Sequence, residues 1–340
     1  MSAIRPRDLL TDDVLEHLHG ADLLAAPAPS EITDDEAPRT AIAGDLGVLR
    51  RAKYLTVTLP EEFGGLGCTL RQAACGQRRL AGTAPMTALA VSTHLYWTGA
   101  AADAYRSGDE SVSWILHEAA RGAIFAAGHG LPGLDLKFSA PDSRCELVAS
   151  GEYELGDASA LASLTPEWDW VAVHALARRE AVLGFAPPGT RRIPAHRVAR
   201  VLPAGAPSDV FTTSAVSWGC AVLASVEFSA ARRAFRRACD LARNETASSA
   251  GGADPGPRSP LDQWPVAEAS LRLDAMKARI ADVTHPWPRI PEPGPDLGGQ
   301  HLISVYAMRH EITEGSARVR ALAAQIASSR SGSGSTIPAR

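Results

Sequence analysis

The spacing of apolar residues divides this chain into three parts. In the first part, apolar residues recur three and four positions apart, which is the pattern of an amphipathic helix. This spacing predicts helices over residues 5–27, 34–53, 71–81, 86–107 and 113–121. We therefore expect residues 1–123 to form an all-helical N-terminal domain.

The helical pattern gives way to short apolar segments at about Ile124. Gly, Pro, Asp and Ser bound these segments, and short runs bounded in this way are typical of strands. They predict strands over residues 145–150, 170–177, 181–186 and 198–202. Residues 124–212 are therefore expected to form a small β domain.

Helical spacing returns at about Val216. It predicts helices over residues 221–247, 264–283 and 301–329, separated by loops rich in Gly, Ser and Pro over 248–260 and 286–299. Residues 213–330 are expected to form a C-terminal helical bundle, and the Ser- and Gly-rich residues 331–340 a disordered tail. The predicted fold class is multidomain α+β, mainly α.

Composition excludes some classes of partner. Of the 340 residues, 45% are hydrophobic and 21% are charged, and the net charge is -4. No basic arm or face stands out, so we expect no nucleic-acid partner. No apolar run approaches a membrane span, so we expect a cytoplasmic protein with no membrane partner. The five cysteines are an odd number, lie far apart and include no Cys-x-x-Cys, which favours free thiols.

A glycine-rich stretch, LPEEFGGLG, occupies residues 59–67. Its glycines allow positive φ angles or close approach of another surface, and Thr69 after it is a candidate helix N-cap. From spacing alone, the stretch predicts a turn between two helical elements. No Lys-Ser or Lys-Thr follows it, so the phosphate-binding P-loop pattern is not met.

LPEEFGGLG also resembles a motif in the N-terminal helical domain of acyl-CoA dehydrogenases. Three later segments are similar to that family in the same order, over residues 113–128, 151–175 and 229–243. The resemblance covers about residues 46–326. It implies the acyl-CoA dehydrogenase fold: an N-terminal helical domain, a middle β domain and a C-terminal helical bundle.

The resemblance also implies a chemistry. Members of the family hold FAD between the β domain and the bundle, and a carboxylate base takes the α-proton of an acyl thioester on CoA or a carrier protein. A hydride then passes to the flavin. The implied function is α,β-dehydrogenation of an acyl thioester, which would suit a role in specialised metabolism.

The base of the family has no obvious counterpart here. In most members it is a Glu in the final segment, whereas this sequence ends in its Ser/Gly tail and so resembles a C-terminally shortened member. In a minority of members the Glu would fall near Gly219, where residues 217–220 hold no carboxylate. His94 and His129 are candidate substitute bases because imidazole titrates near neutrality; the alternative for each is a core or surface histidine.

The positions that would hold FAD are only partly matched. Gly133 and Asp135 match the stretch that follows the first strand of the β domain. Ser163 or Thr165 could donate to the flavin from the strand that flanks its ring system. Arg243 matches an arginine that contacts the FAD of the partner subunit.

Four arginines, Arg232, Arg233, Arg236 and Arg237, form a basic stripe on the predicted helix 221–247. The simplest interpretation of such a stripe is a solvated helix face. Glu227, which precedes the stripe, is predicted to pair with it.

Two hypotheses remain at this point. The first is an FAD-dependent acyl-CoA dehydrogenase-like enzyme. The second is a catalytically degenerate member that acts as the partner subunit of an intact homologue, or as a binding scaffold without dehydrogenase activity. Because the family assembles through its C-terminal bundle, we expect a homo-oligomer or such a heteromer.

Overall fold

The computed structural model describes residues 9–18, 36–127, 143–156, 167–203, 209–249, 260–285 and 297–328. Its helices are α2 (Asp12–Glu16), α3 (Glu36–Arg51), α4 (Leu70–Thr83), α5 (Pro85–Arg106), α6 (Ser113–Ala120), α7 (Val210–Ser249), α8 (Pro260–Val283) and α9 (Leu297–Ser328). Its strands are β1 (Phe125–Ala127), β2 (Ser143–Leu147), β3 (Tyr153–Leu155), β4 (Trp170–Ala177), β5 (Glu180–Ala186), β6 (Arg192–Ile193) and β7 (Val198–Pro203).

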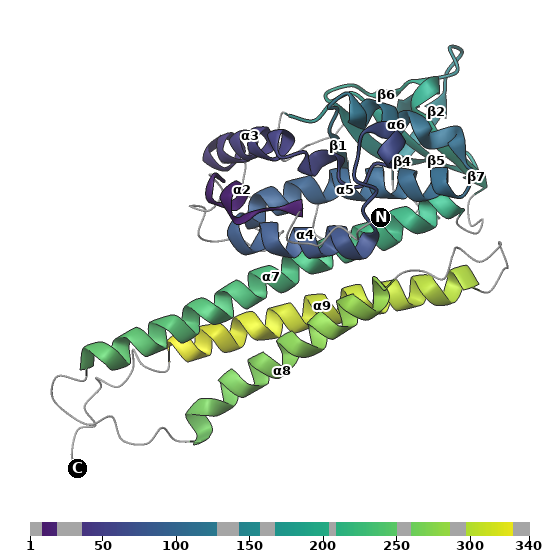
Figure 1. Cartoon of the computed structure of the whole chain (residues 1–340). Helices are drawn as coiled ribbons and strands as arrows, with labels where there is room; N and C mark the ends of the chain where they lie inside the picture. Colours follow the sequence, from purple (N-terminus) through teal and green to yellow (C-terminus); the bar gives the residue numbers. More distant parts are fainter. Residues whose placement is uncertain are drawn as a thin grey trace.

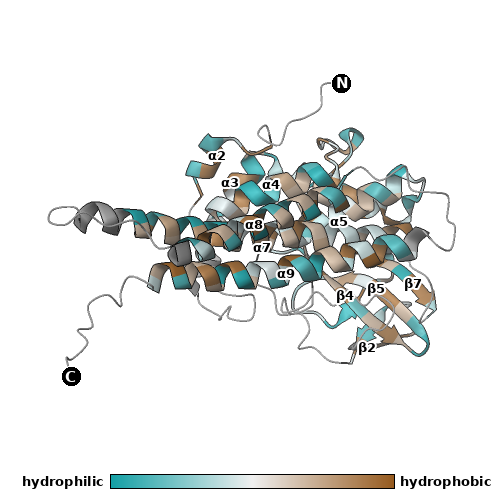
Figure 2. Ribbon diagram, turned by 90° about the horizontal axis from the view of Figure 1, so that it is seen from below, coloured by the Kyte–Doolittle hydropathy of each residue, from teal (hydrophilic) through white to brown (hydrophobic). Residues whose placement is uncertain are grey.

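The N-terminal helices lie over the first half of the long helix α7, with the sheet at one end of them (Figure 1). Helices α7, α8 and α9 extend away from the other end as a bundle. Seen from below, these three helices run side by side (Figure 2). Helix α7 is long and apolar enough to cross a membrane, but 83% of its apolar window is buried inside the protein, as in the core helix of a globular protein.

Most predicted helices are confirmed to within four residues at each end. Within residues 9–18, the single helix predicted over 5–27 is interrupted: Leu9 is helical but Leu10 and Thr11 are not, and a new helix, Asp12–Glu16, runs from an N-cap at Thr11 to a C-cap at His17. Helix α7 begins eleven residues before its predicted start at Ala221. The cause is Asp209, whose carboxylate accepts a hydrogen bond from the Thr212 amide at 2.8 Å and caps the helix.

The glycine-rich turn is confirmed. Gly64 and Gly67 have φ angles of +77° and +61°, and a Cβ on Gly65 would lie 2.1 Å from the Leu59 carbonyl oxygen. Thr69 caps α4 together with Gln72 in a reciprocal capping box. The turn therefore requires glycine for its backbone path, and a structural role explains the motif.

Helix α5 forms the core of the helical part. All of its residues except Asp103, Tyr105 and Arg106 are buried. The polar side chains of a helix that is buried on all sides need hydrogen-bond partners inside the protein. Accordingly, Ser92 accepts a hydrogen bond from the side-chain amide of Gln77 at 2.8 Å.

The sheet has seven strands in the order β6-β3-β2-β4-β5-β7, with β1 also paired to β4. Strands β1 and β2 both run parallel to β4, whereas β5 runs antiparallel to it. The predicted strand over 145–150 ends early, at Leu147, because Gly151 has a φ of +80° and the chain turns there. The other three predicted strands are confirmed.

Aromatic rings join the sheet to α5. The Trp97 ring lies edge-on to Phe185 of β5, with 5.1 Å between ring centroids, and stacks with Phe211 of α7 at 6.1 Å. Phe125 of β1 packs edge-on to Phe185 at 5.4 Å. These buried contacts fix the sheet against both helices.

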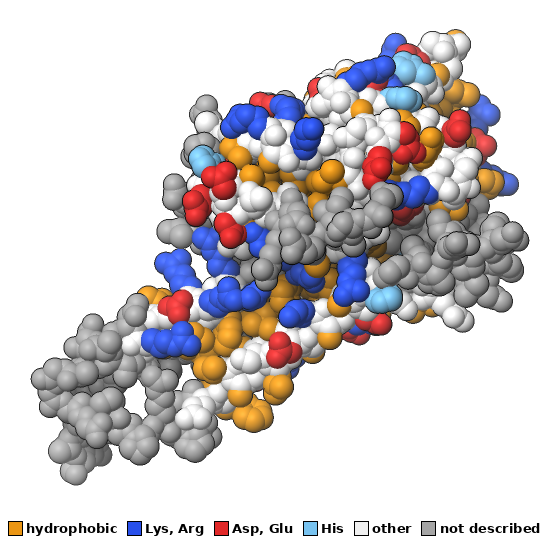
Figure 3. Space-filling view, in the orientation of Figure 1, with side chains coloured by type: hydrophobic (Ala, Val, Ile, Leu, Met, Phe, Trp, Pro, Cys, Tyr) orange, Lys and Arg blue, Asp and Glu red, His pale blue; other side chains and the backbone are white. Residues whose placement is uncertain are grey.

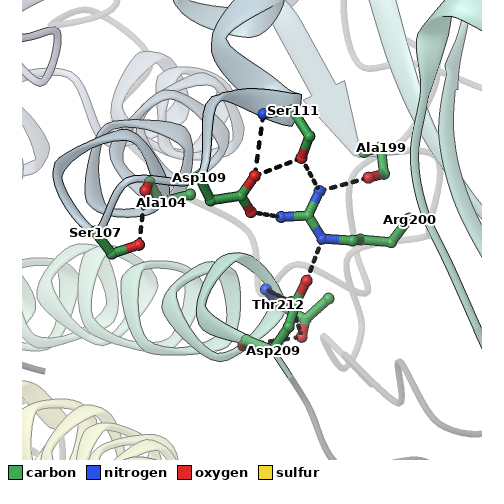
Figure 4. A network of polar contacts seen from close by, with 8 residues as sticks. All are labelled: Ala104, Ser107, Asp109, Ser111, Ala199, Arg200, Asp209 and Thr212. Atoms are coloured by element: carbon green, nitrogen blue, oxygen red, sulfur yellow. Dashed lines mark hydrogen bonds and ion pairs between the residues drawn. The ribbon is translucent and has the colours of Figure 1, made fainter. Parts of the chain in front are cut away.

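A partly buried guanidinium makes a second junction between the sheet and the helices (Figure 4). Arg200 of β7 pairs with Asp109, before α6, and with Asp209, before α7. Its guanidinium also donates to the Ser111 hydroxyl at 2.9 Å. Partial burial alone would raise the pKa of Asp109, but hydrogen bonds from Ser111 and the charge of Arg200 outweigh it and hold that pKa below its usual range.

The crossing of α5 and α7 at Gly99 leads to a test of the packing. A Cβ on Gly99 of α5 would lie 2.4 Å from the Trp218 ring of α7. We predict that Gly99→Ala destabilises the protein by about 1–3 kcal/mol because the core must shift to admit the methyl group. The free energy of unfolding in urea measures the effect.

Gly82→Ala is the matched control. Gly82 is also helical, and a Cβ there would meet nothing within 4 Å. This change should be neutral or stabilise by about 0.5–1 kcal/mol, since alanine favours helix over glycine. Equal effects of the two substitutions would contradict the packing account.

Candidate functional site

The crossing of α5 and α7 places a carboxylate next to the position where a minority of acyl-CoA dehydrogenases would have their base. Trp218, which precedes Gly219, donates a hydrogen bond from its indole Nε1 to the Asp103 carboxylate at 2.7 Å. Arg106 donates to the other carboxylate oxygen at 3.1 Å. Burial raises the pKa of Asp103, although the bonds from Trp218 and Arg106 oppose the shift. A carboxyl group with a raised pKa is a better proton acceptor than an ordinary one.

A serine and a histidine meet on the same stretch of α7. The Ser217 hydroxyl lies 2.8 Å from His301 Nε2 of α9 and 2.9 Å from the Thr213 carbonyl oxygen. The serine has one proton, so donation to Thr213 requires His301 to carry its proton on Nε2. Burial lowers the pKa of His301 to about 4, which keeps the ring neutral at pH 7.

We call this group the α5–α7–α9 cluster; it consists of Asp103, Arg106, Ser217, Trp218 and His301. Sequence reasoning identified residues 217–220 as the comparable position but missed Asp103 and His301. Neither belongs to a recognisable motif, and each reaches the cluster from a different helix.

His94 is held by the backbone on both sides of its ring. Its Nε2 lies 2.7 Å from the Leu55 carbonyl oxygen and its Nδ1 lies 3.3 Å from the Phe125 amide nitrogen. A carbonyl can only accept and an amide can only donate, so Nε2 carries the proton and Nδ1 accepts. The residue is 1% exposed. This geometry gives His94 a structural role, and it leaves no ring nitrogen free to serve as a base.

Glu227 does not pair with the arginine stripe as predicted. Its carboxylate binds Arg309 of α9, at 2.6 Å and 2.7 Å, and accepts a hydrogen bond from Thr313 at 3.0 Å. The stripe begins five residues after Glu227, whereas neighbours on one helix face are three or four residues apart. The stripe itself is exposed at Arg232, Arg236 and Arg237, as expected for a solvated face.

The remaining candidate residues divide into two groups. His129, Gly133, Asp135, Ser163 and Thr165 lie outside the described residues. Arg243 lies on α7, where its guanidinium is exposed and pairs with Asp240 at 3.0 Å.

The described residues therefore do not by themselves assemble a pocket for a flavin. Strands β1 and β2, which flank residues 128–142, both pair with the same edge of β4. Within the described part of the chain, no three His, Cys, Asp or Glu side chains gather in a way that could hold a metal ion.

No family model matches the sequence, and no curated protein matches it. Solved structures do match over nearly the whole chain. FMN-bound TdsC from Paenibacillus sp. A11-2 gives a TM-score of 0.69 at 15% identity, covering 96% of this chain and 89% of that chain. A nitrososynthase from Micromonospora carbonacea var. africana gives 0.68 at 18% identity, covering 95% and 89%. KijD3 in complex with FMN and a dTDP-linked amino sugar gives 0.67 at 18% identity, covering 99% and 92%.

These neighbours are flavoproteins with the acyl-CoA dehydrogenase fold. This chain has the same fold, with helical N- and C-terminal parts around a sheet. The predicted fold class is thereby confirmed, as is the resemblance on which it rested. Identities this low establish the fold alone.

The two backbone bonds of His94 lead to a prediction about pH. Burial lowers the pKa of His94 to about 4, so below pH 6.5 the unfolded histidine binds a proton that the folded one does not. The resulting stability is present above the unfolded pKa and is lost as the pH falls toward 4. We predict that His94→Gln reduces this pH dependence by up to about 1.4 kcal/mol per pH unit.

Glutamine is the informative substitution because it retains a donor and an acceptor but does not titrate. Unfolding in urea at several pH values measures the slope, with the exposed His310→Gln as control. An unchanged slope in His94→Gln, or an equal change in both variants, would show that His94 does not titrate as the geometry requires.

Proposed function

We propose that this chain is a flavin-dependent oxidoreductase. The observation that carries the proposal is the similarity of fold, over 96–99% of the chain, to proteins solved with FMN. TdsC is described as a dibenzothiophene monooxygenase, and nitroalkane oxidase, with a TM-score of 0.61, also has this fold. A bound flavin, FMN or FAD, would supply two-electron redox chemistry.

The first candidate reaction is α,β-dehydrogenation of an acyl thioester, on CoA or a carrier protein. It needs a base for the α-proton, and residues 217–220 contain no carboxylate. Asp103 supports this reaction, since it lies beside Trp218 with a raised pKa. Its hydrogen bonds from Trp218 and Arg106 would hold the carboxylate in one orientation.

The second candidate reaction is oxygenation of a small molecule. The neutral Ser217–His301 pair at the comparable position supports it, because a reaction that breaks no α-C–H bond needs no carboxylate there. The FMN-bound neighbours also support it, since one of them is described as a monooxygenase.

One variant distinguishes the two reactions. If the reaction is dehydrogenation, flavin-loaded wild type should be bleached by an acyl-CoA under anaerobic conditions, and Asp103→Asn should slow this by about 10²–10⁴-fold while retaining flavin. Stopped-flow absorbance measures the rate, and Asp282→Asn at the exposed end of α8 is the control.

Under oxygenation, acyl-CoA would not bleach the flavin, and oxygen uptake by the reduced protein would depend on an added small aromatic or amine substrate. Protein that retains neither FMN nor FAD after gel filtration, alone or with an intact homologue, would contradict the whole proposal. The chain would then be a degenerate member of the fold that acts as a partner subunit or scaffold.

We further propose that the chain forms a homo-oligomer through its bundle. Large apolar side chains remain exposed on α8 and α9: Trp264 at 66%, Leu271 at 70% and Ile303 at 68%. Hydrophobic side chains gather along this bundle in Figure 3. A second copy covering this face would remove these side chains from water.

Sedimentation velocity tests this proposal. Wild type should sediment as a dimer or larger species, which Leu271→Glu/Ile303→Glu dissociates. A monomeric wild type would contradict the proposal.

A further inference from the structure

Arginines from two helices converge on one groove. Arg78 of α4 faces Arg232, Arg233, Arg236 and Arg237 of α7 across a groove of about 340 Å³, and Leu241 lies at one end. We call this the arginine groove. Basic side chains gather over this part of α7 in Figure 3. The Ser229 hydroxyl donates to the Arg78 carbonyl oxygen at 2.9 Å and so fixes the crossing of the two helices.

The charges in the groove are poorly compensated. Arg233 donates to the Thr83 carbonyl oxygen at 2.8 Å, at the C-terminal end of α4. Among the described residues no carboxylate pairs with Arg232, Arg236 or Arg237. Asp240 also lines the groove, but it pairs with Arg243.

Arginines in this arrangement repel one another. Arg232 and Arg236 are four residues apart on α7, as are Arg233 and Arg237, and like charges at this spacing destabilise a helix. Burial, together with the charges of Arg236 and Arg78, lowers the pKa of Arg232. On a single helix face, solvent would screen the repulsion among these arginines. Here Arg78 of α4 adds another positive charge on the opposite side of the groove. A bound anion would offset this repulsion.

The shape of the groove indicates the class of anion. A guanidinium offers a planar fork that binds a phosphate group through two parallel hydrogen bonds. Guanidinium groups on both walls fit a ligand with two linked phosphates better than a single small anion. Leu241, 47% exposed at the edge, offers an apolar contact for a ring attached to the phosphates. The net charge of -4 argues against an extended nucleic acid.

We propose that the arginine groove binds a small molecule that carries a diphosphate, such as a nucleoside diphosphate or a conjugate of one. This inference is independent of the proposed oxidoreductase function, because the groove is formed without any residue of the α5–α7–α9 cluster. The diphosphate could belong to a substrate or to a dinucleotide cofactor, and the experiment separates these sources.

The test is calorimetric titration of flavin-free protein with inorganic pyrophosphate and with ADP. Wild type should bind one equivalent of each, and ADP more tightly because of Leu241. Arg232→Gln/Arg236→Gln should weaken both by about tenfold or more, since it removes two guanidinium contacts. Arg51→Gln/Arg320→Gln, which removes two exposed arginines outside the groove, should bind as wild type does.

Competition then identifies the source of the diphosphate. If pyrophosphate displaces FAD but not FMN, the groove holds the diphosphate of the cofactor; if it displaces neither, the ligand is a substrate. Circular dichroism establishes that the variants remain folded, which is expected because Arg232 and Arg236 are exposed.

Three results would overturn the proposal. The first is no saturable binding of pyrophosphate or ADP to wild type. The second is equal weakening in the groove variant and the control variant, which would indicate only a general effect of charge. The third is that wild type binds no diphosphate while the groove variant sediments differently from wild type. The groove would then be an interface between copies of the chain.

Discussion

The packing of Trp218 onto Gly99 is the contact on which the described structure depends most. It allows α5 and α7 to approach closely enough for the indole to reach Asp103, and it leaves room for no side chain on the facing helix. Helix α5 is buried on nearly every face, so its position determines those of α4, α6 and the sheet. Trp97 of α5 also packs against Phe185 of β5 and Phe211 of α7, so the position of α5 constrains the positions of β5 and α7. A change at this crossing would therefore affect the sheet and the bundle together.

The same crossing bears on the proposed function, because the resemblance to acyl-CoA dehydrogenases implies that a minority of members have their carboxylate base there. Here a serine and an indole occupy the position, a histidine of α9 lies against the serine, and the nearby carboxylate comes from α5 instead of α7. The fold has thus been kept while the groups in its interior differ, which agrees with neighbours that carry FMN and are named for several kinds of oxidation. If the chain is the flavin-dependent oxidoreductase that we propose, its reaction depends on whether Asp103 accepts a proton.

Local features could be predicted from the sequence. The turn at Gly64 and Gly67, the cap at Thr69 and most helix bounds follow from residues a few positions apart. Features that join distant segments could not be predicted. His94 is held by backbone groups 39 and 31 residues away, so no local pattern distinguishes it from a catalytic histidine. Glu227 finds its partner on α9, 82 residues further along the chain, and Arg78 faces the stripe on α7 only because α4 and α7 cross.

The central claim is that this fold still serves flavin chemistry, and the most direct test is a titration of FMN and of FAD with the purified protein, followed by the fluorescence of the flavin. Our account predicts saturable quenching at one site per chain for at least one flavin, with binding retained in Arg232→Gln/Arg236→Gln if the arginine groove serves a substrate. The absence of saturable quenching with either flavin, by the chain alone and in the presence of an intact homologue, would contradict the account. The chain would then use the acyl-CoA dehydrogenase fold as a scaffold without its cofactor.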